Sequence, residues 1–168
     1  WNIAPNRDAT VTPLVSAKRG VGSEFEFRYL EPQHQGDIAT HLLPNDRLTG
    51  HSRYALNLNH ESTLPQDVGM QLRTLRVSDD AYWKDFPRDL GTLTPRLLAS
   101  DFELTRPFGD DWNAYARVQR WQVLQTADPT TRIEAPYERL PQIGARYVQR
   151  LGGGFDLGNA LRGQSGVF

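Results

Sequence analysis

The sequence predicts an all-β fold, an antiparallel up-and-down meander of about eight strands. The main observation is a repeated pattern, in which runs of about ten residues alternate between apolar and polar side chains. Turn-forming residues separate these runs, and the chain has no heptad pattern and no low-complexity tract. Because successive side chains of a strand point to opposite faces, each run predicts a strand with one apolar and one polar face.

The clearest of these runs is SEFEFRYL, at residues 23–30. Its aromatic residues occupy alternate positions, and its charged residues occupy the positions between them. A helix would bring Glu24 and Phe27 to the same side, so the run favours a strand. The aromatic side chains are Phe25, Phe27 and Tyr29, and the charged side chains are Glu24, Glu26 and Arg28.

The other strands follow from the same alternation, with Gly, Pro, Asn and Asp in the turns between them. In chain order the predicted strands are residues 9–18, 23–31, 37–43, 52–60, 68–77, 93–108, 112–124 and 142–151. Residues 78–91, which contain several Asp, aromatic residues and a Pro, are interpreted as a loop or short helix, and residues 126–141, rich in Pro, Thr and Asp, as an irregular connection. The glycine-rich tail at residues 155–168 allows no assignment.

The predicted strands share a strongly polar face and an opposite apolar face. The charged members of the polar face are Glu24, Glu26, Arg28, Arg53, Arg73, Asp101, Glu103, Arg117 and Arg146. The apolar face includes Phe25, Phe27, Tyr29, Tyr54, Leu56 and Leu58. Such a sheet fits either a soluble β-sandwich, with the polar face in solvent, or a transmembrane barrel, with the polar face toward the lumen. Alternation alone does not separate these two possibilities.

Composition leaves the same two possibilities open. Of the 168 residues, 38% are hydrophobic, yet 7 Phe, 6 Tyr and 4 Trp are present. Low hydropathy with many aromatic residues suits a barrel with aromatic girdles, and equally a polar sandwich. The net charge of −1 gives no basis for nucleic-acid binding. No run of about 18 apolar residues predicts a spanning helix, and the absence of Cys excludes a disulfide or thiolate metal site within this segment.

No catalytic, metal-binding or cofactor-binding motif is found. The four histidines lack the spacing of metal ligands and are interpreted as solvated. The carboxylates Asp79, Asp80 and Asp85 lack the pattern of a calcium loop, so we interpret them as part of a solvated connection. Ser165 does not lie in a nucleophile-elbow motif, and the three glycines at 152–154 are not followed by a phosphate-loop Lys. The sequence therefore predicts a protein that is not an enzyme.

An ordered series of short blocks carries a resemblance to a known family. The blocks are WNIAPNRDAT, TP, KRG, EFRYL, LPNDRL, RYALN and RVSDDAYWKDF, and they extend from Trp1 to about Leu140. The series resembles the LPS-assembly proteins of the outer membrane, the LptD or organic-solvent-tolerance family. The resemblance implies that residues 1–168 are part of a large β-barrel domain in a Gram-negative outer membrane. We expect an open, curved sheet and an internal fragment, because no signal peptide precedes Trp1.

The resemblance also implies a function, which is the export of lipopolysaccharide (LPS) through a barrel lumen and a lateral gate into the outer leaflet. Pro13 matches a proline of the second barrel strand, beside the seam where the gate opens. The implied partners are LPS, outer-membrane lipid, an LptE-like lipoprotein plug, and a periplasmic LPS-bridge protein that binds a domain absent from this chain. The polar-face residues are candidates for contacting the plug or the sugar portion of LPS.

Two alternatives remain at this level. A generic outer-membrane porin or transporter would conduct solutes independently of LPS supply. A soluble β-sandwich binding module would have two packed apolar faces and no surface in contact with lipid.

Overall fold

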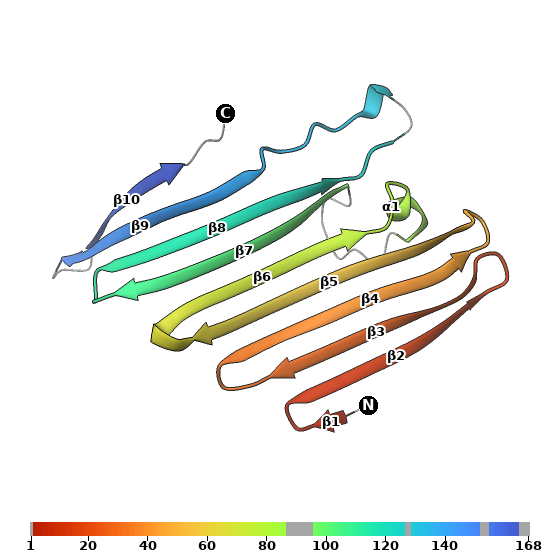
Figure 1. The fold of residues 1–168 in the computed structure, drawn as a ribbon, viewed down its shortest axis with the longest axis horizontal. Helices are drawn as coiled ribbons and strands as arrows, with labels where there is room; N and C mark the ends of the chain where they lie inside the picture. The colour runs from red at the N-terminus through yellow and green to blue at the C-terminus, as the bar shows by residue number, and fades with distance from the viewer. Residues whose placement is uncertain (1, 87–95, 127–128, 152–154, 165–168) are drawn as a thin grey trace.

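A computed structural model describes residues 2–86, 96–126, 129–151 and 155–164. Ten strands form one antiparallel sheet, and their order in the sheet is their order in the chain (Figure 1). The strands are β1 (Asn2–Ala4), β2 (Arg7–Ser16), β3 (Gly20–Leu30), β4 (His34–Asp46), β5 (His51–Leu64), β6 (Val68–Val77), β7 (Leu97–Phe108), β8 (Trp112–Val123), β9 (Arg139–Leu151) and β10 (Phe155–Gln164). The fold is thus the predicted all-β meander.

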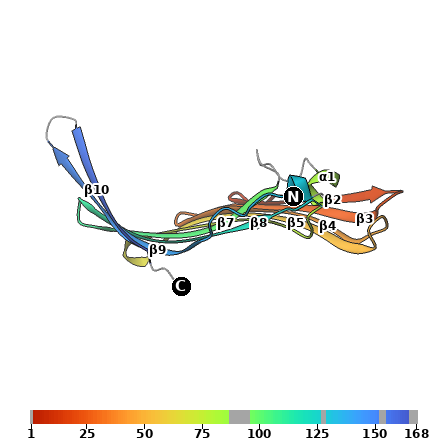
Figure 2. The same ribbon diagram turned by 90° about the horizontal axis from the view of Figure 1, so that it is seen from above.

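The sheet is a single curved layer (Figure 2). The only α-helix of the described residues is α1 (Tyr82–Asp85), and two 3-10 turns cover Pro65–Asp67 and Pro129–Thr131. The strands have their ends on two sides of the sheet. We call the side beside α1 the α1 end, and the side with the β3–β4, β5–β6 and β7–β8 turns the opposite end (Figure 1). Among the described residues, no helix is long and apolar enough to cross a bilayer.

Several strands extend beyond the range expected from the sequence. Polar residues 33–36 and 44–47 suggest turns, but β4 runs from His34 to Asp46 and pairs with β5 over most of that length. Backbone pairing continues there because a sheet with a polar face accommodates polar side chains at the ends of its strands. Likewise β9 begins at Arg139 rather than at 142, and β10 pairs with β9 where no strand was predicted.

The start of β3 shows why glycine misled the prediction. The predicted strands 9–18 and 23–31 leave residues 19–22 as a turn, whereas β3 already begins at Gly20. A Cβ atom at Gly22 would lie 2.6 Å from the backbone oxygen of Leu42 on β4. The glycine therefore permits a close approach of two backbones inside the sheet rather than marking its end.

Strands β6 and β7 separate toward the α1 end. They pair only from Gly69 to Thr74, although β6 continues to Val77. The side-chain amide of Gln122 on β8 then takes the place of a strand partner. It donates to the Val77 carbonyl at 2.9 Å and accepts from the Val77 N–H at 3.1 Å. This satisfies the backbone groups that the separation of β6 and β7 would otherwise leave without partners.

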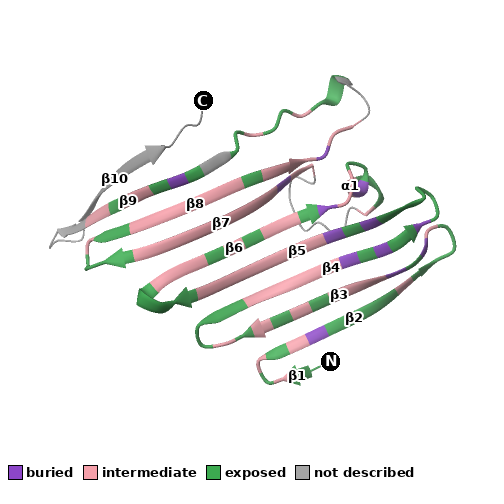
Figure 3. Cartoon of the chain, in the orientation of Figure 1, coloured by how far each residue is buried: buried purple, intermediate pink, exposed green. Residues whose placement is uncertain are grey.

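The hydrophobic core is small and lies at the α1 end of the sheet. It consists of Ala55, Val77, Tyr82, Leu98 and Leu124, with Leu75, Trp83 and Phe86 packed against it. Across the rest of the described sheet most residues are exposed or only half-buried (Figure 3). A sandwich would bury one whole face under a second layer, and the described residues contain no such layer.

Candidate functional site

The strand pairing determines which side chains share a face, because directly paired residues of antiparallel strands point to the same side. Arg28 pairs with Asp8 and Asp37, and Glu103 pairs with Gln71 and Arg117. The structure places the charged residues of the predicted polar face on one side, here called the polar face: Glu24, Glu26, Arg28, Arg53, Arg73, Asp101, Glu103, Arg117 and Arg146. The other side, the apolar face, carries Phe25, Phe27, Tyr29, Tyr54, Leu56 and Leu58.

Charges on the polar face form pairs between neighbouring strands. Arg28 donates two hydrogen bonds of 2.9 Å to the Asp8 carboxylate. Arg117 lies 3.6 Å from Glu103 and 3.9 Å from Asp101, and Arg73 lies 4.0 Å from Glu61. Pairs of opposite charge such as these are typical of a surface that faces water, rather than of an acid–base pair in a closed site.

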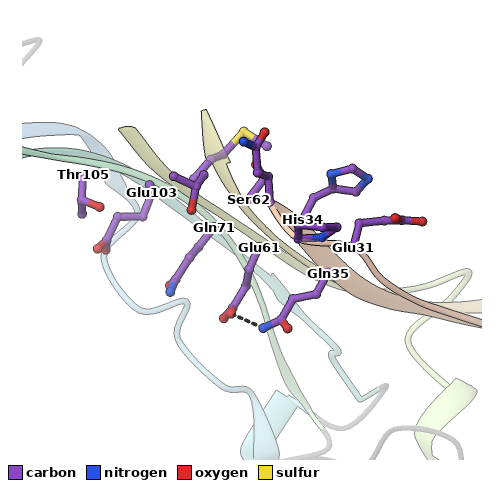
Figure 4. Close-up of a pocket in the computed structure, with 13 residues that line it drawn as sticks. Glu31, His34, Gln35, Glu61, Ser62, Gln71, Glu103 and Thr105 are labelled. Carbon is purple, nitrogen blue, oxygen red and sulfur yellow. Dashed lines mark hydrogen bonds between the residues drawn. The ribbon is translucent and has the colours of Figure 1, made fainter. Parts of the chain in front are cut away.

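Two neighbouring hollows lie on the polar face. The first, of about 310 Å³, is lined by acidic and amide side chains, among them Gln35, Glu61, Gln71 and Glu103 (Figure 4). Gln35 donates a 3.0 Å hydrogen bond to Glu61 across it. The second, of about 390 Å³, lies over β7 to β9 and shares Glu103 with the first.

The second hollow adds positive charge to the polar face. It is lined by Arg117 and Arg146, together with Tyr115, Asn113 and Gln142. The polar face thus offers acceptors for hydroxyl groups beside guanidinium groups suited to phosphate. Within the described part of the chain, no group of three His, Cys, Asp or Glu side chains is arranged to hold a metal ion.

A buried ion-pair cluster closes the polar face at the α1 end. We define this cluster as Arg19, Asp46, Arg53, Asp79 and Asp85. Arg53 binds Asp79 through two hydrogen bonds of 2.9 Å and also binds Asp85. Arg19 bridges Asp46 at 2.5 Å and Asp85 at 2.8 Å. The side chains of Asp46 and Arg53 are almost fully buried, at 0% and 2% exposure.

Aromatic rings complete this cluster. The guanidinium carbons of Arg19 and Arg53 lie 4.9 Å and 5.1 Å from the centre of the Phe86 ring. His41 packs edge-on against Phe86 at 4.7 Å and shares a hydrogen bond with the Tyr82 hydroxyl. Cation–π and ring contacts of this kind hold the segment from Asp79 to Phe86 against the polar face.

The environment of Asp79 shifts its pKa. Burial disfavours its charged form, but hydrogen bonds from Arg53 and Ser78 outweigh this and hold the pKa of Asp79 below its ordinary value. Its oxygens also accept from the Ala81 N–H at 3.1 Å. The charged carboxylate is therefore the form that attaches the connection to the sheet.

These contacts correct the interpretation of the connection as solvated. Asp79 and Asp85 form ion pairs, and His41 is buried at 5% exposure. These contacts are not predictable from the sequence, because Arg53 and Asp79 lie 26 positions apart and no pattern links them. The one available signal was the concentration of aromatic residues in SDDAYWKDF, which is unusual for a solvated loop.

Pro13 lies on β2, where its Cα pairs with Ser23 of β3. On its other side, β2 has described pairing to β1 only at Arg7 and Asp8. Pro13 is therefore next to an edge of the described sheet.

A curved, single-layer antiparallel sheet with one charged face and one uncovered apolar face has the construction of a β-barrel wall. Comparison with known proteins identifies the protein family. The family LPS transport system D, LptD, matches residues 51–161. The chain belongs to the LptD family, which confirms the resemblance, and LptD proteins lie in the outer membrane of Gram-negative bacteria.

Individual relatives agree with this assignment. The LPS-assembly protein LptD of Albidiferax ferrireducens is 43% identical over 93% of this chain and 20% of the relative. Those of Paracidovorax citrulli and Ralstonia nicotianae are 44% and 38% identical, over 93% and 94% of this chain and 20% and 19% of the relatives. The chain thus spans about a fifth of the length of the curated relatives it matches.

Proposed function

We propose that this chain forms part of the wall of an outer-membrane barrel that assembles LPS in the outer leaflet. Its polar face lines the lumen and its apolar face contacts lipid. The observation that carries the proposal is the separation of charge between the faces. The paired carboxylates of β2 to β8 all lie on the polar face: Asp8, Glu24, Glu26, Asp37, Asp46, Glu61, Asp101 and Glu103.

The hollows of the polar face suit the headgroup of LPS, which carries sugars and phosphates. Acceptors such as Glu61 and Gln71 would bind hydroxyl groups, and Arg117 and Arg146 would bind phosphates. A lipoprotein plug inside the barrel would contact the same face. The periplasmic bridge that delivers LPS would bind a different part of the full-length protein. Transport of this kind needs no catalysis by these residues.

The edge beside Pro13 is the proposed lateral gate. Proline lacks an N–H and cannot donate to a strand ladder, so pairing beside it is weaker. Each backbone hydrogen bond contributes about 1 kcal/mol net, so one missing donor lowers the free energy needed to separate strands there.

The first experiment tests the two faces. Single cysteines at Phe25, Glu26, Phe27 and Arg28 in the full-length parent protein are probed in outer membranes with lipid-phase and water-phase reagents. We expect 25 and 27 to react from lipid, and 26 and 28 only from water. Shielding of 25 and 27 from both reagents would instead identify a protein core, as in a β-sandwich.

A second experiment tests the substrate. A photo-crosslinking residue at Arg117 should capture LPS, and the crosslink should disappear when delivery of LPS from the periplasm is blocked. The control position is Val118, the next residue of β8, which points to the apolar face. We expect it to contact bulk lipid whether or not LPS is delivered. A crosslink at 117 that persists without LPS delivery, together with solute conductance, would favour the generic porin.

A further inference from the structure

The sheet has an interruption between β6 and β7 at the α1 end, here called the seam. The backbone ladder between these two strands stops at Thr74 and Ser100, although both strands continue beyond that point. The ladders on either side are longer, because β5 pairs with β6 as far as Val77 and β7 pairs with β8 from Leu97. Among the described residues, no strand pairing crosses the seam itself. The sheet is therefore joined there without a ladder.

Side chains hold the seam together instead. The amide of Gln122 on β8 donates to the Val77 carbonyl at 2.9 Å and accepts from the Val77 N–H at 3.1 Å. In the small hydrophobic core, Val77 and Tyr82 from the β6 side pack with Leu98 and Leu124 from the other side. Apolar packing is non-directional, whereas a ladder of hydrogen bonds fixes both distances and angles. The seam therefore permits small displacements that a ladder would resist.

The end of β8 uses the same device a second time. Gln125 donates to the Ile133 carbonyl at 2.8 Å and accepts from the Ile133 N–H at 3.2 Å. This second glutamine fastens the connection after β8 to β8 itself and does not bridge to β6. Of the two glutamines, Gln122 alone spans the seam.

On the N-terminal side of the seam the sheet is braced. The buried ion-pair cluster joins Arg19 in the β2–β3 turn, Arg53 on β5 and Asp79 after β6 through shared carboxylate and guanidinium groups. Together with the ladders between the strands, these contacts fix β2 to β6 as one unit. We call this unit the gate panel, because Pro13 lies on its edge strand.

We infer that the seam is a hinge in the barrel wall, and that the gate panel turns about it when the proposed gate opens, with Gln122 as the latch. The inference rests on the proposed function. Hinges are a few positions that absorb the movement between two rigid parts. Because the gate panel is braced, bending concentrates where the ladder first fails. The part of β6 that stays paired with β7, Gly69 to Thr74, forms the pivot.

The latch also answers a requirement of the bilayer. A backbone N–H or carbonyl that loses its partner inside a membrane costs several kcal/mol, and β6 presents both groups of Val77 toward the seam. A neighbouring strand cannot follow one moving residue, but the flexible side chain of Gln122 can. Both groups thus keep their partner while the gate panel turns.

The first measurement asks whether the seam moves. Nitroxide labels on pairs of cysteines, in the full-length protein in bilayers, report distances by double electron–electron resonance. Leu42→Cys with Arg120→Cys spans the seam, and the control Val11→Cys with Arg76→Cys lies within the gate panel, also four strands apart. We expect Gln122→Ala to broaden the distances across the seam several-fold and to leave the control unchanged. No broadening, or equal broadening of both pairs, would overturn the hinge.

The second measurement leaves the latch intact and asks whether export needs the movement. Leu75→Cys and Ala99→Cys, which continue the register of β6 and β7 past the end of their ladder, are joined by a short cleavable cross-linker. The control joins Leu75→Cys to Asn57→Cys, which the β5–β6 ladder already holds together. We expect the tie across the seam to slow LPS export several-fold, cleavage to restore it, and the control tie to leave it unchanged.

The outcomes separate this inference from the proposed function. If both ties leave export as fast as in the untied protein, or slow it equally, the hinge fails while the role in LPS assembly stands. If the untied protein exports no LPS, the proposed function fails, and the label distances alone then decide whether the seam moves.

Discussion

Arg53 on β5 binds Asp79 through two parallel hydrogen bonds of 2.9 Å, although the two residues lie 26 positions apart. The Arg53 side chain is 2% exposed, and it also contacts Asp46 and Asp85. This one guanidinium joins β4, β5 and the connection after β6. It therefore determines where that connection lies on the polar face.

Replacing Arg53 tests this role directly. Arg53→Ala removes the arginine that pairs with Asp79 and leaves Asp46 and Asp85 paired with Arg19 alone, and breaking a buried pair costs about 3–5 kcal/mol. We expect the segment from Asp79 to Phe86 to become sensitive to protease in the folded, membrane-inserted protein. Arg28→Ala is the control, because the Arg28 side chain is 67% exposed and solvent screens an ion pair of this kind. Equal protection in both variants would show that Arg53 does not hold the segment.

The pKa of Asp79 predicts a response to acid. Its pKa in the folded protein lies below the ordinary value of about 3.9, so its charged form adds stability above that value. This contribution declines as the pH falls through the lower, folded pKa. Protease sensitivity of residues 78–86 should therefore rise in the acid range below about pH 4. Asp79→Asn should make the segment sensitive at every pH, and a variant that kept the wild-type acid profile would contradict this role.

Tyr82 contributes through both its ring and its hydroxyl. The side chain is completely buried, packs on Phe86 with ring centres 4.8 Å apart, and shares a hydrogen bond with His41. Tyr82→Phe keeps the packing and should lower the free energy of unfolding by about 1 kcal/mol. Tyr82→Ala also leaves a cavity and should lower it by about 3–5 kcal/mol. Unfolding in urea after extraction into detergent measures both, and equal effects would show that the ring packing contributes little.

Gly36 on β4 lies beneath the ring of Tyr29 from β3. A Cβ atom at Gly36 would lie 2.5 Å from the Tyr29 hydroxyl and 2.4 Å from the Asn59 carbonyl oxygen. Gly36→Ala should therefore strain the β3–β5 pairing and destabilise the protein by about 1–3 kcal/mol.

A matched variant separates packing from hydrogen bonding at this position. Tyr29→Phe keeps the ring over Gly36 and removes only the hydrogen bond to His60, so it should cost about 1 kcal/mol. The melting temperature of the purified protein is the measurement. A Gly36→Ala protein as stable as wild type would show that β3 and β4 shift to accept the methyl group.

Pro13 provides the test of the proposed gate. Pro13→Ala restores a backbone N–H, so we expect tighter pairing at the edge, slower LPS export and greater permeability of the outer membrane to antibiotics. Pro107→Ala is the control, because Pro107 lies on β7, in the interior of the strand order, where its Cα pairs with Asn113 of β8. Normal export and an unchanged permeability barrier in the Pro13 variant would argue against a gate at this edge.

The two faces of the sheet could be predicted from single strands. Phe25 and Glu26 lie on opposite faces in any strand, because the backbone geometry alternates with a period of two. Strand ends are less predictable, since polar residues such as His34 and Gln35 continue the ladder instead of ending it. Ladder length depends on the neighbouring strand, which local sequence does not report.

Alternation along the single strands is therefore enough to predict the all-β class, the antiparallel order and the partition of side chains between a polar and an apolar face. The register between strands follows from the tertiary structure alone, which aligns Arg120 of β8 with Phe27 of β3 through successive strand pairs. The tertiary structure also decided the partners of Arg53, because contacts with Asp79 and Asp85 join segments 26 and 32 positions apart. Alternation is a local property of the backbone, whereas register and ion pairs depend on how distant strands are brought together.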